Sequence, residues 1–197
     1  MINSPLIIDS RMTIEEAIAG TAAPRDVIES LSLINIRYRA FDGRLHQGQL
    51  VVHEEVVPDI LEIFRFIEAL GFPVARAIPI VRYGWSDDRS MADNNSSAFN
   101  YRLVLGTERL SRHAFGRAVD INPCQNPVIY ENGRISPDGA TYDVGKEGTF
   151  SETHSVIREF QRREWQWGGH FKTLKDYHHF DKVEEIIRIR AFDVKNR

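Results

Sequence analysis

The segment 111–120, with sequence SRHAFGRAVD, constrains this chain more than any other stretch of it. It places His113 and Asp120 seven positions apart, and a second polar cluster, DYHHFD at 176–181, lies near the C-terminus. Together the two segments supply imidazole and carboxylate groups of the kinds that bind zinc. A catalytic zinc ion takes three protein ligands and leaves a fourth position open. A further protein group must then act as general base, and the two segments offer enough side chains for both roles.

The residues around Asp120 predict a short buried strand. The run 118–122 (AVDIN) alternates between apolar and polar side chains and ends before a proline. Because side chains on a strand alternate faces, Asp120 points away from the apolar side. His113 precedes this strand in a loop or short turn. The small residues Gly116 and Ala118 allow the backbone to approach closely beside a metal.

The C-terminal cluster needs a turn if both of its outer polar residues are to reach one ion. Asp176 and His179 are three positions apart, one residue off the strict alternation of a strand. A turn that leads into the strand at His178 would let both side chains converge.

The pattern Ser-x-His-x-x-Gly-x-Ala-x-Asp, followed by a late Asp/Glu-x-x-His, resembles the D-alanyl-D-alanine carboxypeptidase family of zinc peptidases. This family includes VanY-type carboxypeptidases, VanX-type dipeptidases and L-alanyl-D-glutamate endopeptidases of phages and bacteria. It shares a core with lysostaphin-like peptidases and with the N-terminal domain of hedgehog proteins. The resemblance extends from about residue 83 to residue 181, and the stretches WQWGG (165–169) and DYHHF (176–180) are most similar to the endopeptidase-like subgroup.

The resemblance implies a role for each polar residue of the two motifs. His113, Asp120 and His179 would bind Zn²⁺, and Asp176 would be the general base. His178 would lie behind the ligands or face solvent, because only one of the two adjacent histidines should bind the metal. Asp181 is expected to end the strand rather than to touch the metal.

Members of this family also carry an arginine upstream of the first metal motif, where it grips the substrate. Arg102 is our choice, because a planar guanidinium can hold a carboxylate through two hydrogen bonds. Arg89 and Arg117 are alternatives. In the commoner family arrangement the arginine lies farther upstream, and the competing interpretation of Arg102 is a surface arginine paired with an acidic neighbour.

The remaining histidines and the single cysteine have no motif support. Lone histidines are interpreted as surface or hydrogen-bonded core residues, although one of them, His170, is close enough in sequence to line the site; the set is His46, His53, His154 and His170. Cys124 excludes an intramolecular disulfide framework and is interpreted as a small buried apolar residue.

Composition limits the function classes. At 197 residues, with 27% charged and 42% hydrophobic residues, the chain suits one globular domain. Its formal net charge of −3 gives no indication of a nucleic-acid partner. No apolar run is long enough to span a membrane, and the N-terminus lacks the basic region of a signal peptide. We therefore expect the protein to stay in the cytoplasm or to reach the cell envelope by another route, such as phage release through a holin.

Hydrophobic periodicity predicts an α+β fold in a single domain, 1–197. Residues 1–82 should hold two short helices, the first with a capping box at Thr13 and the second beginning at Pro24. A hairpin of strands over 34–40 and 45–53, a helix from about 57 to a C-cap at Gly71, and a strand over 74–81 should follow.

Residues 83–181 are expected to form the core of the metal site. This region begins with a polar loop over 83–100. It contains a hairpin signal at Asn132-Gly133 within 128–136, which is either a lid or substrate wall or a purely structural excursion. A helix capped by Ser151 should come next. We expect one antiparallel sheet of about four to six strands, with the metal on one face and helices on the other.

The motifs and the resemblance together predict a zinc-dependent peptidase, and the resemblance implies that it acts on the mixed L/D stem peptides of bacterial peptidoglycan. A D-Ala-D-Ala carboxypeptidase, a dipeptidase and an L-Ala-D-Glu endopeptidase all share the same motifs. One alternative is a hedgehog-like domain that keeps zinc for binding or structure, but such a site has no use for a base such as Asp176. Another is a wall-binding module without metal, which would not need the three ligand residues.

Overall fold

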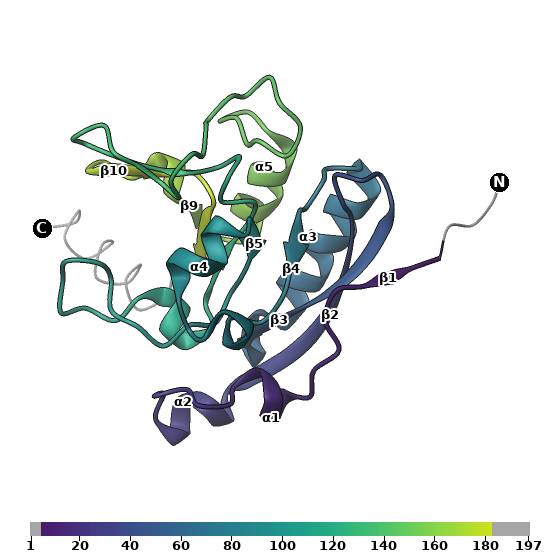
Figure 1. Cartoon of the computed structure of the whole chain (residues 1–197), viewed down its shortest axis with the longest axis vertical. Helices are drawn as coiled ribbons and strands as arrows, with labels where there is room; N and C mark the ends of the chain where they lie inside the picture. The colour runs from purple at the N-terminus through teal and green to yellow at the C-terminus, as the bar shows by residue number, and fades with distance from the viewer. Residues whose placement is uncertain (1–4, 183–197) are drawn as a thin grey trace, which may run out of the picture.

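The computed structural model describes residues 5–182, which mix helices and strands along the chain (Figure 1) and so confirm the α+β class. The α-helices are α1 (Ile14–Ala17), α2 (Arg25–Glu29), α3 (Val57–Leu70), α4 (Asp87–Ala92) and α5 (Ser155–Arg162). The strands are β1 (Ile7–Ile8), β2 (Leu31–Arg39), β3 (Leu45–His53), β4 (Arg76–Ala77), β5 (Asn95–Ser96), β6 (Ala118–Asp120), β7 (Val128–Tyr130), β8 (Ile135–Ser136), β9 (Trp165–Trp167), β10 (Leu174–Asp176) and β11 (His179–Lys182). Short 3₁₀ helices span Glu54–Val56, Ile80–Tyr83, Arg112–Phe115 and Gly168–His170. Within residues 5–182, no helix combines the length and the apolar character needed to cross a bilayer.

The strands form several small sheets, in place of the single sheet of four to six strands expected from the sequence. Three sheets have the orders β1-β3-β2, β10-β7-β8 and β6-β11-β9, and β4 pairs with β5. Most pairs are antiparallel, whereas β1–β3 and β4–β5 are parallel. Near the site the strands stay short because the backbone turns sharply after them. Asn122, two residues beyond β6, has a φ of 50°, a left-handed conformation through which a strand cannot continue.

The predicted hairpin and the helix that follows it are confirmed. Strands β2 and β3 pair antiparallel over their whole length, and α3 packs along β2 (Figure 1). The helix ends at Gly71, whose φ of 74° is the left-handed C-cap conformation that glycine adopts without strain. Its buried face consists of Ile60, Ile63, Phe64 and Ile67.

One apolar core joins the N-terminal hairpin to the strands near the C-terminus. The main cluster of buried residues runs from Ile34 in β2 to Phe180 in β11. Aromatic stacking links the two regions: Phe72 lies 4.8 Å from Phe150 between ring centroids, and Phe160 of α5 lies 3.9 Å from Phe180. The strand that carries His179 is therefore fixed to the body of the protein through its apolar face.

The segment between α3 and the first metal motif differs from the prediction. The expected strand over 74–81 is reduced to β4, and the expected loop over 83–100 contains α4 and β5. The Asn95 side chain makes hydrogen bonds of 2.9 Å with both backbone groups of Ile78, which replaces strand pairing there. Helix α4 begins where the Ser86 hydroxyl accepts a hydrogen bond from the backbone of Arg89. Its short polar sequence gives no apolar stripe, so periodicity could not reveal it.

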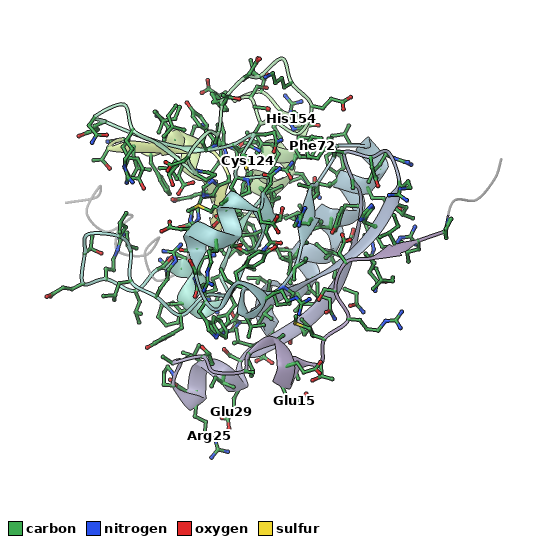
Figure 2. The ribbon with its side chains drawn as sticks, viewed as in Figure 1. Glu15, Arg25, Glu29, Phe72, Cys124 and His154 are labelled. Atoms are coloured by element: carbon green, nitrogen blue, oxygen red, sulfur yellow. The ribbon has the colours of Figure 1, made fainter. Side chains whose placement is uncertain are left out.

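Helix α5 begins at Ser155, and its N-cap is His154 rather than the predicted Ser151. The Nδ1 atom of His154 accepts a hydrogen bond from the backbone N–H of Val156 at 3.3 Å. Its ring also packs against Phe72, at 5.0 Å between centroids. Figure 2 labels the two residues next to each other. Histidine is not among the usual N-cap residues, so the sequence rules placed the cap on a nearby serine.

Candidate metal centre

His113 lies in the 3₁₀ helix Arg112–Phe115 and is almost completely buried. The Ser111 hydroxyl begins this helix by accepting a hydrogen bond from the backbone N–H of His113 at 3.3 Å. The ring Nδ1 is in close contact with the carbonyl oxygen of Ala98. Because a carbonyl oxygen only accepts, Nδ1 carries the hydrogen and Nε2 keeps its lone pair for the site.

Gly116 ends the same 3₁₀ helix. Its small size was expected to let the backbone approach a metal, but in the structure it lets the backbone approach His53. Its φ is 64°, and a Cβ atom there would lie 2.5 Å from the backbone nitrogen of His53. The backbone of Gly116 therefore lies directly against the last residue of β3. The backbone N–H of His53 donates to the Gly116 carbonyl at 2.9 Å, which anchors the His113 segment to the long hairpin.

Asp120 and His179 face each other across a pair of strands. They are register partners in the antiparallel pairing of β6 with β11. The Nδ1 atom of His179 lies 3.0 Å from Asp120 Oδ1. The Nε2 atom of His113 completes the group, at 3.1 Å from Asp120 Oδ2 and 3.1 Å from His179 Nδ1. The structure therefore brings together the three residues that the sequence singled out.

This cluster has the donor set of a zinc site. Two imidazole nitrogens and one carboxylate oxygen lie within 4.8 Å of one another. Three protein ligands of these types, with a fourth position left free, are characteristic of catalytic zinc. The Nε2 atom of His179 faces away from the cluster, toward Asp181 Oδ2 at 3.8 Å. Asp181 belongs to β11 but also lies behind this candidate ligand, as the outer partners of metal sites do.

The carboxylate and the imidazoles of the cluster shift one another's pKa values. Burial alone would raise the pKa of the Asp120 carboxyl, but the charges of His113 and His178 hold it well below its usual range. Burial alone would lower the pKa of His179, whereas its neighbouring carboxylates, Asp120 and Asp181, raise it well above its usual value. A metal ion bound here would compete with protons for the same atoms, because metal ligands bind in their deprotonated forms.

Asp176 ends β10, and a two-residue turn separates it from His179 at the start of β11, as predicted. Its Oδ1 atom is buried and lies 3.0 Å from the Nε2 atom of His178. Burial would raise the pKa of this carboxyl, but the nearby charge of His178 lowers it. An ionised, buried carboxylate close to the candidate ligands suits a group that takes up a proton.

His178 is 3% exposed, so the interpretation in which it faces solvent is wrong. Its Nε2 atom lies 3.0 Å from Asp176 Oδ1 and 3.9 Å from Asp120 Oδ2. Burial alone would lower the pKa of this imidazole, but the two carboxylates raise it to about 9. His178 therefore lies behind the candidate ligands, between the two acidic groups.

The hairpin over 128–136 is present and supports Asp176. Strand β7 pairs with β8 on one side and with β10 on the other, and Val128 is the register partner of Asp176. Of the two interpretations left open by the sequence, the structural one has a visible basis, because the hairpin completes the sheet that carries Asp176.

The three candidate arginines lie in different surroundings. Arg102 forms an ion pair with Asp87, whose other oxygen accepts a 2.7 Å hydrogen bond from Asn100. The backbone N–H of Asn100 in turn donates to the His113 carbonyl at 3.1 Å. The acidic neighbour of the competing interpretation is therefore present, and a substrate role for Arg102 stays a prediction. The alternatives are engaged elsewhere: Arg117 pairs with Glu55, and Arg89 packs against Gly84.

Two asparagines that the sequence analysis missed shape the loop behind the site. Asn122 binds the backbone of Ala75 and of Pro73 through its side chain, at 2.9 and 2.8 Å. Asn126 accepts a 2.7 Å hydrogen bond from the backbone of Phe150. Each asparagine precedes a proline in the run NPCQNP at 122–127, and this repeated Asn-Pro signal could have revealed them.

A surface cavity of about 360 Å³ lies next to the strand that carries Asp176. The predicted site-lining candidate His170 contributes to it, whereas His46, His53 and His154 do not. Trp165 and Trp167 are almost completely buried and pack in the core, although Trp167 also reaches the cavity wall. The cavity is lined by Tyr142, Glu152, Trp167, Gly169, His170, Lys175 and Tyr177.

Comparison with known families identifies the segment that carries the cluster. Residues 105–182 match the family model described as D-alanyl-D-alanine carboxypeptidase. The match includes the three candidate ligands and Asp176, while Arg102 lies just before it. No curated protein and no solved structure matched the chain. The resemblance predicted from the motifs is thus confirmed over this segment, and it indicates a metallopeptidase.

Proposed function

We propose that this chain is a zinc-dependent peptidase that hydrolyses peptide bonds in the stem peptides of bacterial peptidoglycan. The observation that carries the proposal is the convergence of His113, Asp120 and His179 beside Asp176, within the segment that matches the family. The substrate class follows from the description of that family. The chemistry follows from the side chains.

Each residue of the cluster has a distinct role in the proposed reaction. Zinc held by His113, Asp120 and His179 would polarise the scissile carbonyl and lower the pKa of a water molecule. Asp176 is ionised at neutral pH, since its pKa is lowered, and its Oδ1 atom is buried. It would accept the proton of the attacking water and later deliver it to the leaving amine.

Arg102 would determine which end of a stem peptide binds. Its guanidinium is held by Asp87 on one side and is partly exposed on the other. A terminal carboxylate of the substrate could replace or share this partner through the two parallel hydrogen bonds that arginine favours. Such a contact would favour cleavage next to a free D-alanine carboxylate or beside the acidic D-glutamate of the stem.

Digestion of purified peptidoglycan by the zinc-loaded protein tests the proposal, with the released fragments identified by mass spectrometry. Release of free D-alanine would define a carboxypeptidase, and fragments that begin with D-glutamate would define an endopeptidase. The matched control is Asp176→Asn, which keeps the shape but cannot take up a proton. We expect it to retain zinc and to lose about 10²–10⁴-fold in hydrolysis. A zinc-loaded wild type that cleaves no stem peptide, or an Asn variant as fast as the wild type, would contradict the assignment.

A further inference from the structure

The imidazole of His178 is fixed in place by the loop behind the metal cluster. Its Nδ1 atom lies 2.8 Å from the carbonyl oxygen of Asn126. Because a carbonyl only accepts, Nδ1 must carry the hydrogen of this bond. The Asn126 side chain is itself anchored, since its amide donates to the Gly148 carbonyl at 2.8 Å and its oxygen accepts from Phe150 at 2.7 Å. The orientation of the His178 ring is therefore set by rigid backbone.

The backbone of His178 is held as firmly as its ring. Its carbonyl accepts a 3.0 Å hydrogen bond from Ile121, the residue that follows β6. The turn between β10 and β11 is thus tied to the strand that carries Asp120. With both ring and backbone fixed, the position of Nε2 is determined before any substrate binds.

That Nε2 atom faces Asp176. It lies 3.0 Å from Oδ1, and within residues 5–182 no other ion pair reaches this carboxylate. Asp120 Oδ2 lies 3.9 Å from the same Nε2 atom, so the imidazole stands between two acidic groups that would otherwise repel each other.

We propose that His178 is a positioning residue, which holds the Asp176 carboxylate at the place from which it exchanges a proton with the reacting water. This inference rests on the proposed function and extends it to a residue outside the ligand-and-base set. A general base must stay within hydrogen-bond reach of the proton it takes. Displacement of a reacting group by about 1 Å can cost about a hundredfold in rate.

Two substitutions at this position separate the contact with Asp176 from the presence of a buried polar side chain. In His178→Gln, the side-chain amide nitrogen falls near the position of Nε2 and can still donate to Asp176. In His178→Asn, the shorter side chain places its amide near the position of Nδ1, where it reaches the Asn126 carbonyl but not Asp176. A matched control is His154→Asn, which removes a half-buried histidine that caps α5.

The expected result is a difference in kcat between the two variants. His178→Asn should lose about a hundredfold in kcat. His178→Gln should recover most of that loss, and both should keep the wild-type KM and one zinc per chain. His154→Asn should keep the wild-type kcat. Equal kcat values for the Asn and Gln variants would overturn the proposal, and so would loss of zinc from the Asn variant, since His178 would then act on the metal ligands.

Crystal structures of the two zinc-loaded variants give a second readout that does not depend on activity. The Asp176 carboxylate should leave its position in His178→Asn and keep it in His178→Gln. An unmoved carboxylate in His178→Asn would overturn the inference even if the rate fell. Should the wild type cleave no stem peptide, the proposed function fails on its own, and the carboxylate positions still decide whether His178 holds Asp176.

Discussion

The substitution Gly168→Ala should damage catalysis without touching a metal ligand. Gly168 begins the 3₁₀ helix Gly168–His170, directly beside the backbone of Asp176. A Cβ atom on Gly168 would lie 2.9 Å from the Asp176 Cβ and closer still to its carbonyl oxygen. Ordinary contact begins at 3.4 Å, so Asp176 must move by at least about 0.5 Å, and its carbonyl must move farther.

The size of this displacement sets the expected effect. If a shift of about 1 Å costs about a hundredfold, one of about 0.5–1 Å should lower kcat between about ten- and a hundredfold. The overpacking should also reduce stability by about 1–3 kcal/mol. Steady-state hydrolysis of a stem peptide, zinc analysis and thermal unfolding measure the three quantities.

The matched control is Gly145→Ala, where an added Cβ meets only the flexible Asp143 carboxylate at 3.3 Å. We expect the control to keep the wild-type kcat, and both variants to keep their zinc. A Gly168→Ala protein that retains wild-type kcat would refute the view that the Asp176 backbone is held in contact with Gly168.

Three further predictions address metal, substrate and stability. Zinc at about 100 times its Kd should stabilise the wild type by about 2.7 kcal/mol in thermal unfolding, and His179→Ala should abolish most of this gain; an equal gain in the variant would remove His179 from the ligand set. Arg102→Lys keeps the charge but loses the fork geometry, so kcat/KM should fall strongly, whereas an unchanged value would exclude Arg102 from substrate binding. Burial alone would raise the pKa of the Asp59 carboxyl, but hydrogen bonds from Lys182 and Trp165 outweigh it and lower this pKa below 3.8. The ionised carboxylate therefore stabilises the fold above that pH, and this stabilisation is lost as the pH falls. Asp59→Asn should therefore cost about 1–2 kcal/mol at pH 7 and progressively less below about pH 4, as urea unfolding at several pH values can show; a pH-independent cost would refute this linkage.

Local patterns predicted the elements whose side chains repeat regularly. The alternation in β2 and the apolar stripe of α3 each follow from one face packing on the core, so the sequence alone revealed them. The strand β3 was predicted as the return strand of the hairpin, and its buried side chains form a continuous run without alternation. The turn before His179 and the hairpin over 128–136 were also predictable, because their signals are local. Where a side chain replaces backbone pairing, as Asn95 does for Ile78, hydrophobic periodicity gives no signal, and the predicted strand over 74–81 is confirmed only over β4.

The candidate site likewise contains some relations that local sequence patterns predict and others that depend on tertiary contacts. His113 and Asp120 lie close in the chain, and the spacing between them already indicated a shared role. The pairing of Asp120 with His179 spans 59 positions and depends on the register of β6 with β11, which no local pattern specifies. The anchoring of His178 through Asn126 is likewise a tertiary contact. Family resemblance supplied the long-range relations that residue patterns could not.

The position of β11 in the chain also determines when the candidate metal centre can form during synthesis. This strand comes last among those described, yet it lies at the centre of its sheet, between β6 and β9. At a synthesis rate of about 5–20 residues per second, the 59 positions from Asp120 to His179 take about 3–12 s to emerge. For most of that interval a nascent chain holds His113 and Asp120 but has neither His179 nor Asp176. The candidate metal centre is therefore complete only after β11 inserts between β6 and β9.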